Sequence, residues 1–152
     1  MTAWQKRALA GGIIWTVVAA GFLVCVFAGD GPAAFTEGTA ARNIAAGFVA
    51  AGIFSHLVLR YLTRSRAGSR SLQIDERDIR ISQRSSEGAF AALAIFVFIS
   101  CIALHDKYQD AGSVPAGWLW ILAYASWILG YLSLSITSLV MYYRSGGGHA
   151  EG

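Results

Sequence analysis

Four long apolar stretches constrain the fold of this chain more than any other feature. They cover about residues 8–28, 44–62, 88–104 and 118–142, and none of them contains an acidic residue or a proline. A helix needs ~20 mostly apolar residues to cross the hydrocarbon core of a bilayer, and each stretch is close to that length. The sequence therefore predicts an all-α integral membrane protein, a single domain over residues 1–152 with four transmembrane helices.

The composition agrees with a membrane protein. Of 152 residues, 55% are hydrophobic and 14% are charged, whereas a soluble domain carries about 25% charged residues. The first apolar run, about 20 residues long, exceeds the 7–15 residues of a cleaved signal peptide, which favours a retained span. Cys25 and Cys101 lie far apart without a C-x-x-C pattern, and we interpret them as small buried hydrophobic residues.

The basic residues predict the orientation. Of the twelve Lys and Arg residues, seven fall between positions 60 and 84. If the N-terminus is cytoplasmic, all twelve except Arg42 and Lys107 lie on the cytoplasmic side, as the positive-inside rule requires. We therefore expect a multi-pass protein of the inner (cytoplasmic) membrane, with both termini and the loop 63–87 in the cytoplasm, next to anionic lipid headgroups.

Small residues recur along three of the predicted spans, where they would let helix backbones approach closely. The first span carries Ala8, Gly12, Thr16 and Ala20, the second carries Gly47, Ala51 and Ser55, and the fourth carries Ser126, Gly130, Ser133 and Thr137. We expect the first two stripes to face each other or the centre of the bundle. The same small-residue stripes are also compatible with packing between two copies of the chain in a homodimer.

The densely charged segment 71–87 predicts an ordered helix. Asp75 is a helix-capping residue type, acidic residues suit a first helical turn, and Glu76 lies four residues before Arg80. We expect one helix to run from Asp75 into the third span as a cytoplasmic extension. Its candidate interaction residues are Asp75, Glu76, Arg77, Asp78, Arg80 and Arg84, of which the three arginines form one stripe.

This segment also carries a resemblance. The letters "DERD" at 75–78, followed by Ile79 and Arg84 and by an Ala-rich span, resemble the motif of a group of small, uncharacterised prokaryotic membrane proteins. Many of these are encoded beside small helix-turn-helix regulators. The resemblance covers about twenty residues, implies a four-span bundle and implies no established activity.

Few residues inside the spans can carry chemistry. His56 is the one ionisable residue well inside a predicted span, and it is our intramembrane polar candidate. Cys101 and His105 are four residues apart, and Cys25 is expected at a similar depth, so these three are weak candidates for a soft-metal site. No other pattern predicts a metal, and none predicts a cofactor.

The function predicted from these features is non-enzymatic. The spans lack the embedded carboxylate of small multidrug exporters, and no phosphate-binding glycine loop is present in a strand-to-helix context. We expect an interaction or regulatory membrane protein acting through segment 71–87 on a cytoplasmic or membrane protein, without direct binding to nucleic acid. The alternatives are a small transporter or transporter accessory subunit that uses His56, and an intramembrane metal or redox protein.

Overall fold

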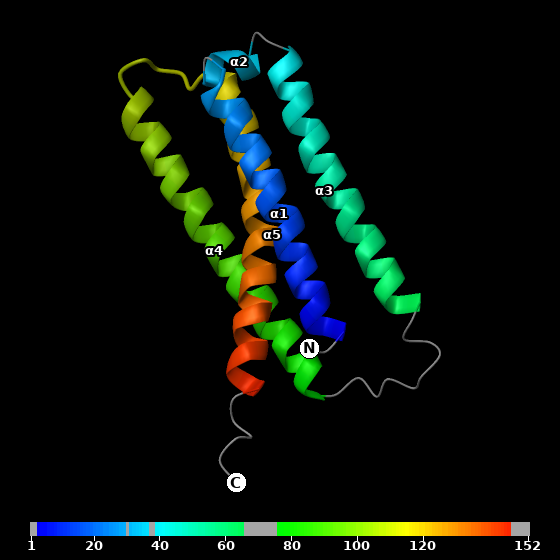
Figure 1. The fold of residues 1–152 in the computed structure, drawn as a ribbon. Helices are drawn as coiled ribbons and strands as arrows, with labels where there is room; N and C mark the ends of the chain where they lie inside the picture. Colours follow the sequence, from blue (N-terminus) through cyan, green and yellow to red (C-terminus); the bar gives the residue numbers. More distant parts are fainter. Residues whose placement is uncertain (1–2, 30, 37–38, 66–75, 147–152) are drawn as a thin grey trace.

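The computed structural model describes residues 3–29, 31–36, 39–65 and 76–146, and these form helices joined by short connections (Figure 1). The helices are α1 (Ala3–Phe27), α2 (Pro32–Thr36), α3 (Thr39–Ser65), α4 (Glu76–Tyr108) and α5 (Ala116–Gly146). No strand occurs in these ranges. The all-helical prediction is confirmed there.

Four of the helices are long and apolar enough to cross a membrane. Their candidate spans are Gln5–Phe27, Ala40–Leu62, Ile79–Tyr108 and Ala116–Arg144. Each candidate span contains most of one apolar stretch predicted from the sequence. Each helix is longer than its candidate span. Large apolar side chains such as Phe90 and Phe98 point outward, 73% and 68% exposed, as expected where lipid replaces water. The fold is therefore that of a multi-pass membrane protein.

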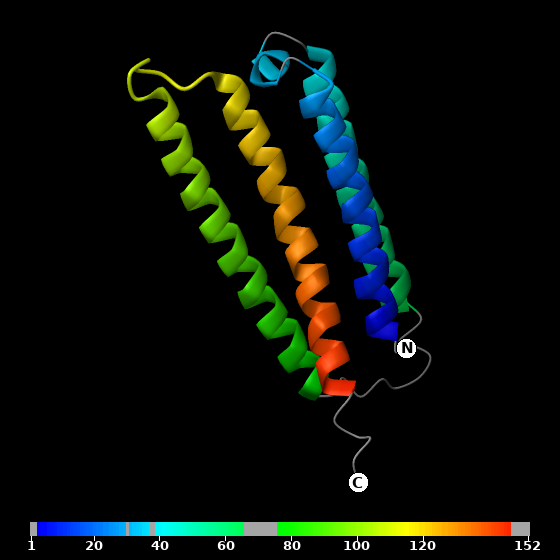
Figure 2. The same cartoon turned by 60° about the vertical axis from the view of Figure 1, so that its left-hand side comes forward.

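The four long helices pack in the order α4, α5, α1, α3, with a smaller direct contact between α3 and α5. One end of the bundle contains the first residues of α1 and α4 and the last residues of α3 and α5 (Figure 1). We call this the basic end, because Lys6, Arg7, Arg60 and Arg84 lie there. Figure 2 shows α4 and α5 diverging from the basic end toward the opposite end.

Aromatic side chains build the core near the opposite end and in the middle of the bundle. Trp15 is fully buried and stacks on Tyr131, with ring centroids 4.5 Å apart. Phe22 packs edge-on against Phe35 of α2 at 6.3 Å. The buried cluster comprises Trp15, Val18, Phe22, Phe35, Ala45, Val49 and Ile128. The core thus joins α1, α2, α3 and α5.

The small-residue stripe predicted for α3 is wrong, because Gly47, Ala51 and Ser55 are all exposed. The face of α3 that packs against α1 instead carries Ala45, Val49 and Gly52. A Cβ atom at Gly52 would lie 2.9 Å from Val18 Cγ2 and 3.3 Å from the Trp15 ring. The missing side chain at Gly52 therefore leaves room for an aromatic ring. The buried face of α3 is rotated by roughly 130° from the predicted one, at 3.6 residues per turn.

The stripe on α1 is also largely misplaced. Thr16 and Ala20 are exposed and Gly12 is half-buried, while Gly11, Trp15, Val18 and Phe22 are buried. Large side chains bury more contact surface than small ones, so the helix turns its aromatic face inward. On α5, Thr137 does contact α4, since a Cβ atom at Gly88 would lie 3.3 Å from its methyl carbon.

The connection between α1 and α3 is more ordered than a turn. It contains α2, which starts at Pro32, a residue well suited to a first helical position. Gly31 before it has a φ of 61°, which glycine adopts without strain. Phe35 anchors α2 in the core, and the carbonyl of Pro32 lies against Gly117, where a Cβ atom would not fit. Helix α2 thereby covers the end opposite the basic end.

Candidate basic pocket

A cavity of about 510 Å³ lies at the basic end, between all four long helices. Helix α1 contributes two of its lining residues, α3 three, α4 three and α5 five. They are Arg7, Ala8, His56, Leu57, Arg60, Ile81, Ser82, Ser86, Tyr131, Leu134, Ser135, Ser138 and Tyr142. We call this cavity the basic pocket.

Two arginines from different helices supply its charge. Arg7 is half-buried on α1, and Arg60 is exposed at the end of α3. The two guanidinium groups lie close enough to repel each other, although both also interact with other groups in the fold. The lining residues named above include no aspartate or glutamate. The part of the lining that the structure describes therefore carries two arginine side chains from different helices.

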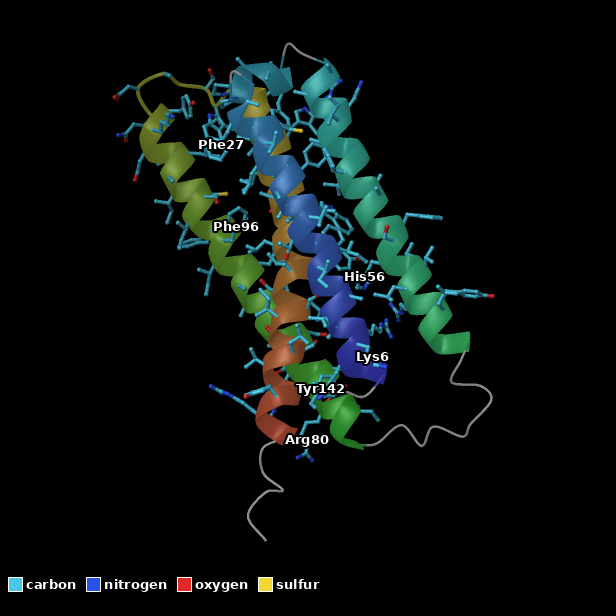
Figure 3. The ribbon with its side chains drawn as sticks, viewed as in Figure 1. Lys6, Phe27, His56, Arg80, Phe96 and Tyr142 are labelled. Atoms are coloured by element: carbon cyan, nitrogen blue, oxygen red, sulfur yellow. The ribbon has the colours of Figure 1, made fainter. Side chains whose placement is uncertain are left out.

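His56 points into the bundle from the side of α3 that faces α1 (Figure 3). Its ring lies 4.9 Å from the Tyr131 ring, centroid to centroid, and 3.8 Å from the place a Cβ atom would take at Gly11. Its Nδ1 atom is buried without a hydrogen-bond partner among the described residues. His56 lies six residues, or about 9 Å, from the end of its span at Leu62. The intramembrane polar candidate named from the sequence, His56, is therefore one of the residues that line the pocket.

Serine hydroxyls make the rest of the lining polar, but they are partly satisfied by their own helices. Ser135 donates to the Tyr131 carbonyl at 3.0 Å, Ser138 to the Leu134 carbonyl at 2.8 Å and Ser86 to the Ser82 carbonyl at 3.0 Å. Each hydroxyl oxygen keeps acceptor capacity while its proton is engaged. Strong donors toward a bound group must therefore come mainly from the arginines.

The first turns of α4 form one wall of the pocket. The helix is continuous from Glu76 into the span, as expected for a helical extension. Ile81 and Ser85 are buried, and Ser85 Oγ lies 3.8 Å from Met141 Sδ of α5. The extension is therefore packed into the bundle, while Arg80 and Arg84 are exposed on its outer side.

Several predicted interaction residues lie outside what the structure describes. Asp75 precedes the described part of α4, and the side chains of Glu76, Arg77 and Asp78 are likewise not described. The predicted pair between Glu76 and Arg80 stays a prediction. Of the six candidates, only Arg80 and Arg84 have described side chains. Arg80 lies at the same end as Lys6 and Tyr142 (Figure 3).

The structure does not bring the three metal candidates together. Cys25 is half-buried beside the aromatic core, whereas Cys101 and His105 are exposed on α4. The interpretation of Cys101 as a buried hydrophobic residue is therefore wrong. Among the described residues, no group of three or more His, Cys, Asp or Glu side chains is arranged to hold a metal ion. Cys25, Cys101 and His105 therefore do not form such a group.

Sequence reasoning missed three pocket residues. Arg7 and Arg60 were counted only as determinants of orientation, and Tyr142, which is 6% exposed and lines the pocket, was not singled out as a site residue. One signal was available, because His56 and Arg60 are four residues apart and so share a helical face. Arg7 had no such signal, since its neighbours come from other helices.

The fold and the pocket define a multi-pass membrane protein, whose described residues include four helices long enough to cross a membrane and a basic cavity at one end of the bundle. Comparisons with protein-family models, curated proteins and solved structures gave no match. The resemblance of residues 75–84 to a group of small membrane proteins stays a prediction.

Proposed function

We propose that the protein is a non-enzymatic membrane protein that binds an anionic ligand in the basic pocket. The observation that supports this most directly is that Arg7 and Arg60, from two different helices, line the same cavity together with His56. Its volume of about 510 Å³ falls in the ~300–1,000 Å³ range of small-molecule sites.

The chemistry of the lining favours an oxyanion such as a phosphate group. Guanidinium groups present planar pairs of N–H donors that match phosphate and carboxylate oxygens. A bound anion would also relieve the repulsion between Arg7 and Arg60. His56 Nδ1 provides one more polar atom for the ligand.

The arginine pair is tested by binding. Replacing Arg7 and Arg60 together with glutamine is expected to weaken binding of inorganic phosphate at least tenfold, about 1.4 kcal/mol. Binding is measured by isothermal titration calorimetry on detergent-solubilised protein at constant ionic strength. Transport is the alternative function, because His56 lines the pocket, and phosphate uptake into proteoliposomes distinguishes transport from binding alone.

The matched control removes the same charge elsewhere. Arg84 and Arg144 are exposed and do not line the pocket. Their double replacement with glutamine is expected to leave the phosphate affinity within twofold of the original protein. If both double variants weakened phosphate binding equally, the effect would come from net charge, and a specific site would be contradicted. The absence of phosphate binding by the original protein would contradict the site as well.

We also propose that the basic end lies in the cytoplasm and that the start of α4 contacts a protein partner there. The supporting observation is the division of these turns into two faces. Ile81 and Ser85 are buried, while Arg80, Arg84 and Ile79, the last 46% exposed, point outward. An exposed apolar side chain near two exposed cations complements an acidic protein surface that also carries apolar groups.

One crosslinking experiment tests both the orientation and the contact. A membrane-impermeant crosslinker is expected to join the protein to a partner in inside-out vesicles and not in right-side-out vesicles. Reversing the charge of Arg80 and Arg84 to glutamate is expected to remove that product because the cationic contact is lost. Arg144→Glu, at the same end of the bundle, is the control. Persistence of the product in the double variant would exclude this surface.

A further inference from the structure

An apolar groove adjoins the basic pocket. It has a volume of about 390 Å³ and lies between α4 and α5. Its lining comprises Ser86, Ala89, Leu93, Ser126, Trp127, Gly130, Tyr131 and Leu134. Ser86, Tyr131 and Leu134 line the pocket as well as the groove. The basic pocket and the apolar groove therefore share one wall. Their combined surface is charged in the pocket and apolar in the groove.

The groove runs from the basic end toward the middle of the spans. Along α4 it extends from Ser86 to Leu93, seven residues or about 10 Å of helix. Helices α4 and α5 diverge in this direction (Figure 2). Gly130 widens the groove, because a Cβ atom there would meet nothing within 4 Å. Trp127 is 51% exposed, so its ring stays accessible from the surrounding bilayer.

We propose that the ligand is an anionic phospholipid, whose phosphate headgroup binds in the basic pocket while one acyl chain lies in the groove between α4 and α5. This inference rests on the proposed function and names its ligand class. A soluble anion would use the pocket alone. A zwitterionic lipid such as phosphatidylcholine has the same phosphate, but it would also place a positively charged ammonium group beside Arg7 and Arg60. An anionic lipid complements both parts at their observed positions, with its head near the end of the spans and its chain inside them.

The test uses detergent-solubilised protein and native mass spectrometry. Phosphatidylglycerol is titrated against phosphatidylcholine with the same acyl chains, and inorganic phosphate is titrated separately by calorimetry. The original protein is expected to bind phosphatidylglycerol at least tenfold more tightly than phosphatidylcholine. Gly130→Leu fills the groove from α5 and is expected to weaken phosphatidylglycerol binding at least fivefold, with phosphate binding unchanged.

Two further variants keep the test interpretable. Gly47→Leu adds the same side chain to open surface on α3 and is expected to bind lipid like the original protein. Leu93→Trp narrows the groove from α4 and is expected to reproduce Gly130→Leu, so the test does not depend on one variant's folding.

The outcomes separate this inference from the function on which it rests. Unchanged phosphatidylglycerol binding in both Gly130→Leu and Leu93→Trp would overturn the lipid inference. If phosphate binding still depended on Arg7 and Arg60 in that case, the proposed anion-binding function would remain supported. Equal affinity for the two lipids would also overturn the lipid inference. If the double arginine variant kept both its lipid binding and its phosphate binding, both proposals would be overturned.

Discussion

Leucine at Gly52 is expected to destabilise the bundle by forcing α1 and α3 apart. Even a Cβ atom at this position would lie 2.9 Å from Val18 Cγ2 and 3.3 Å from the Trp15 ring. Trp15 cannot move aside easily, because it is fully buried and stacked on Tyr131. Overpacking of this kind costs about 1–3 kcal/mol or more, so we expect a clear drop in the thermal unfolding midpoint measured in detergent.

Gly47→Leu provides the comparison on the same helix. Gly47 has nothing within 4 Å of its Cβ position and is exposed. The substitution also replaces glycine with a better helix former, which stabilises a helix interior by roughly 0.5–1 kcal/mol. We therefore expect its midpoint to match or exceed that of the original protein. If Gly47→Leu were the more damaging variant, α3 would face α1 with the side that the small-residue stripe predicted.

Replacing Trp15 with alanine is expected to cost about 3–5 kcal/mol of unfolding free energy, the usual range for a large aromatic residue in a core. The ring is 0% exposed and joins α1 to Tyr131 on α5 and to Gly52 on α3. Its removal leaves a cavity at the contact of three helices. Because lipid offers apolar groups little hydrophobic drive to associate, the loss is mainly one of packing contacts. Denaturation by a graded SDS titration measures it.

Trp127→Ala is the matched variant for this prediction. Trp127 also stacks on Tyr131, with centroids 5.9 Å apart, but it is 51% exposed. Its removal deletes one face of a contact and leaves no enclosed cavity, so we expect a loss below about 1 kcal/mol, as for aromatic pairs considered alone. Similar losses for the two tryptophans would show that the aromatic cluster around Trp15 is not the centre of the fold.

The helices were well predicted because the signals that define them are local. Four stretches of sufficient length and apolarity each became a helix, and the continuous run of α4 from Glu76 followed from residue types in its first turn. Helix α2 was not predicted. Its five residues lie in a connection rich in turn-forming residues, and it is held by the burial of Phe35 in the core, which no local pattern records.

The candidate site was predicted only in part. His56 was singled out because an ionisable residue within a span is costly, and the structure places it on the pocket wall. Arg7 and Arg60 were attributed to orientation alone, since basic residues are common at the ends of spans. Only the packing of α1 beside α3 and α5 brings Arg7, Arg60 and Tyr142 around one cavity.

The sequence by itself determined which long segments are helical, how many of them could cross a membrane and where the basic residues gather. The tertiary structure alone decided which face of each helix is buried. In a soluble helix, alternation of apolar and polar residues marks the buried face. In these spans almost every face is apolar, so that contrast is missing, and shape determines the packing. Gly52 leaves room for Trp15 and Val18, whereas a Cβ atom at Gly47, five residues earlier, would meet nothing within 4 Å.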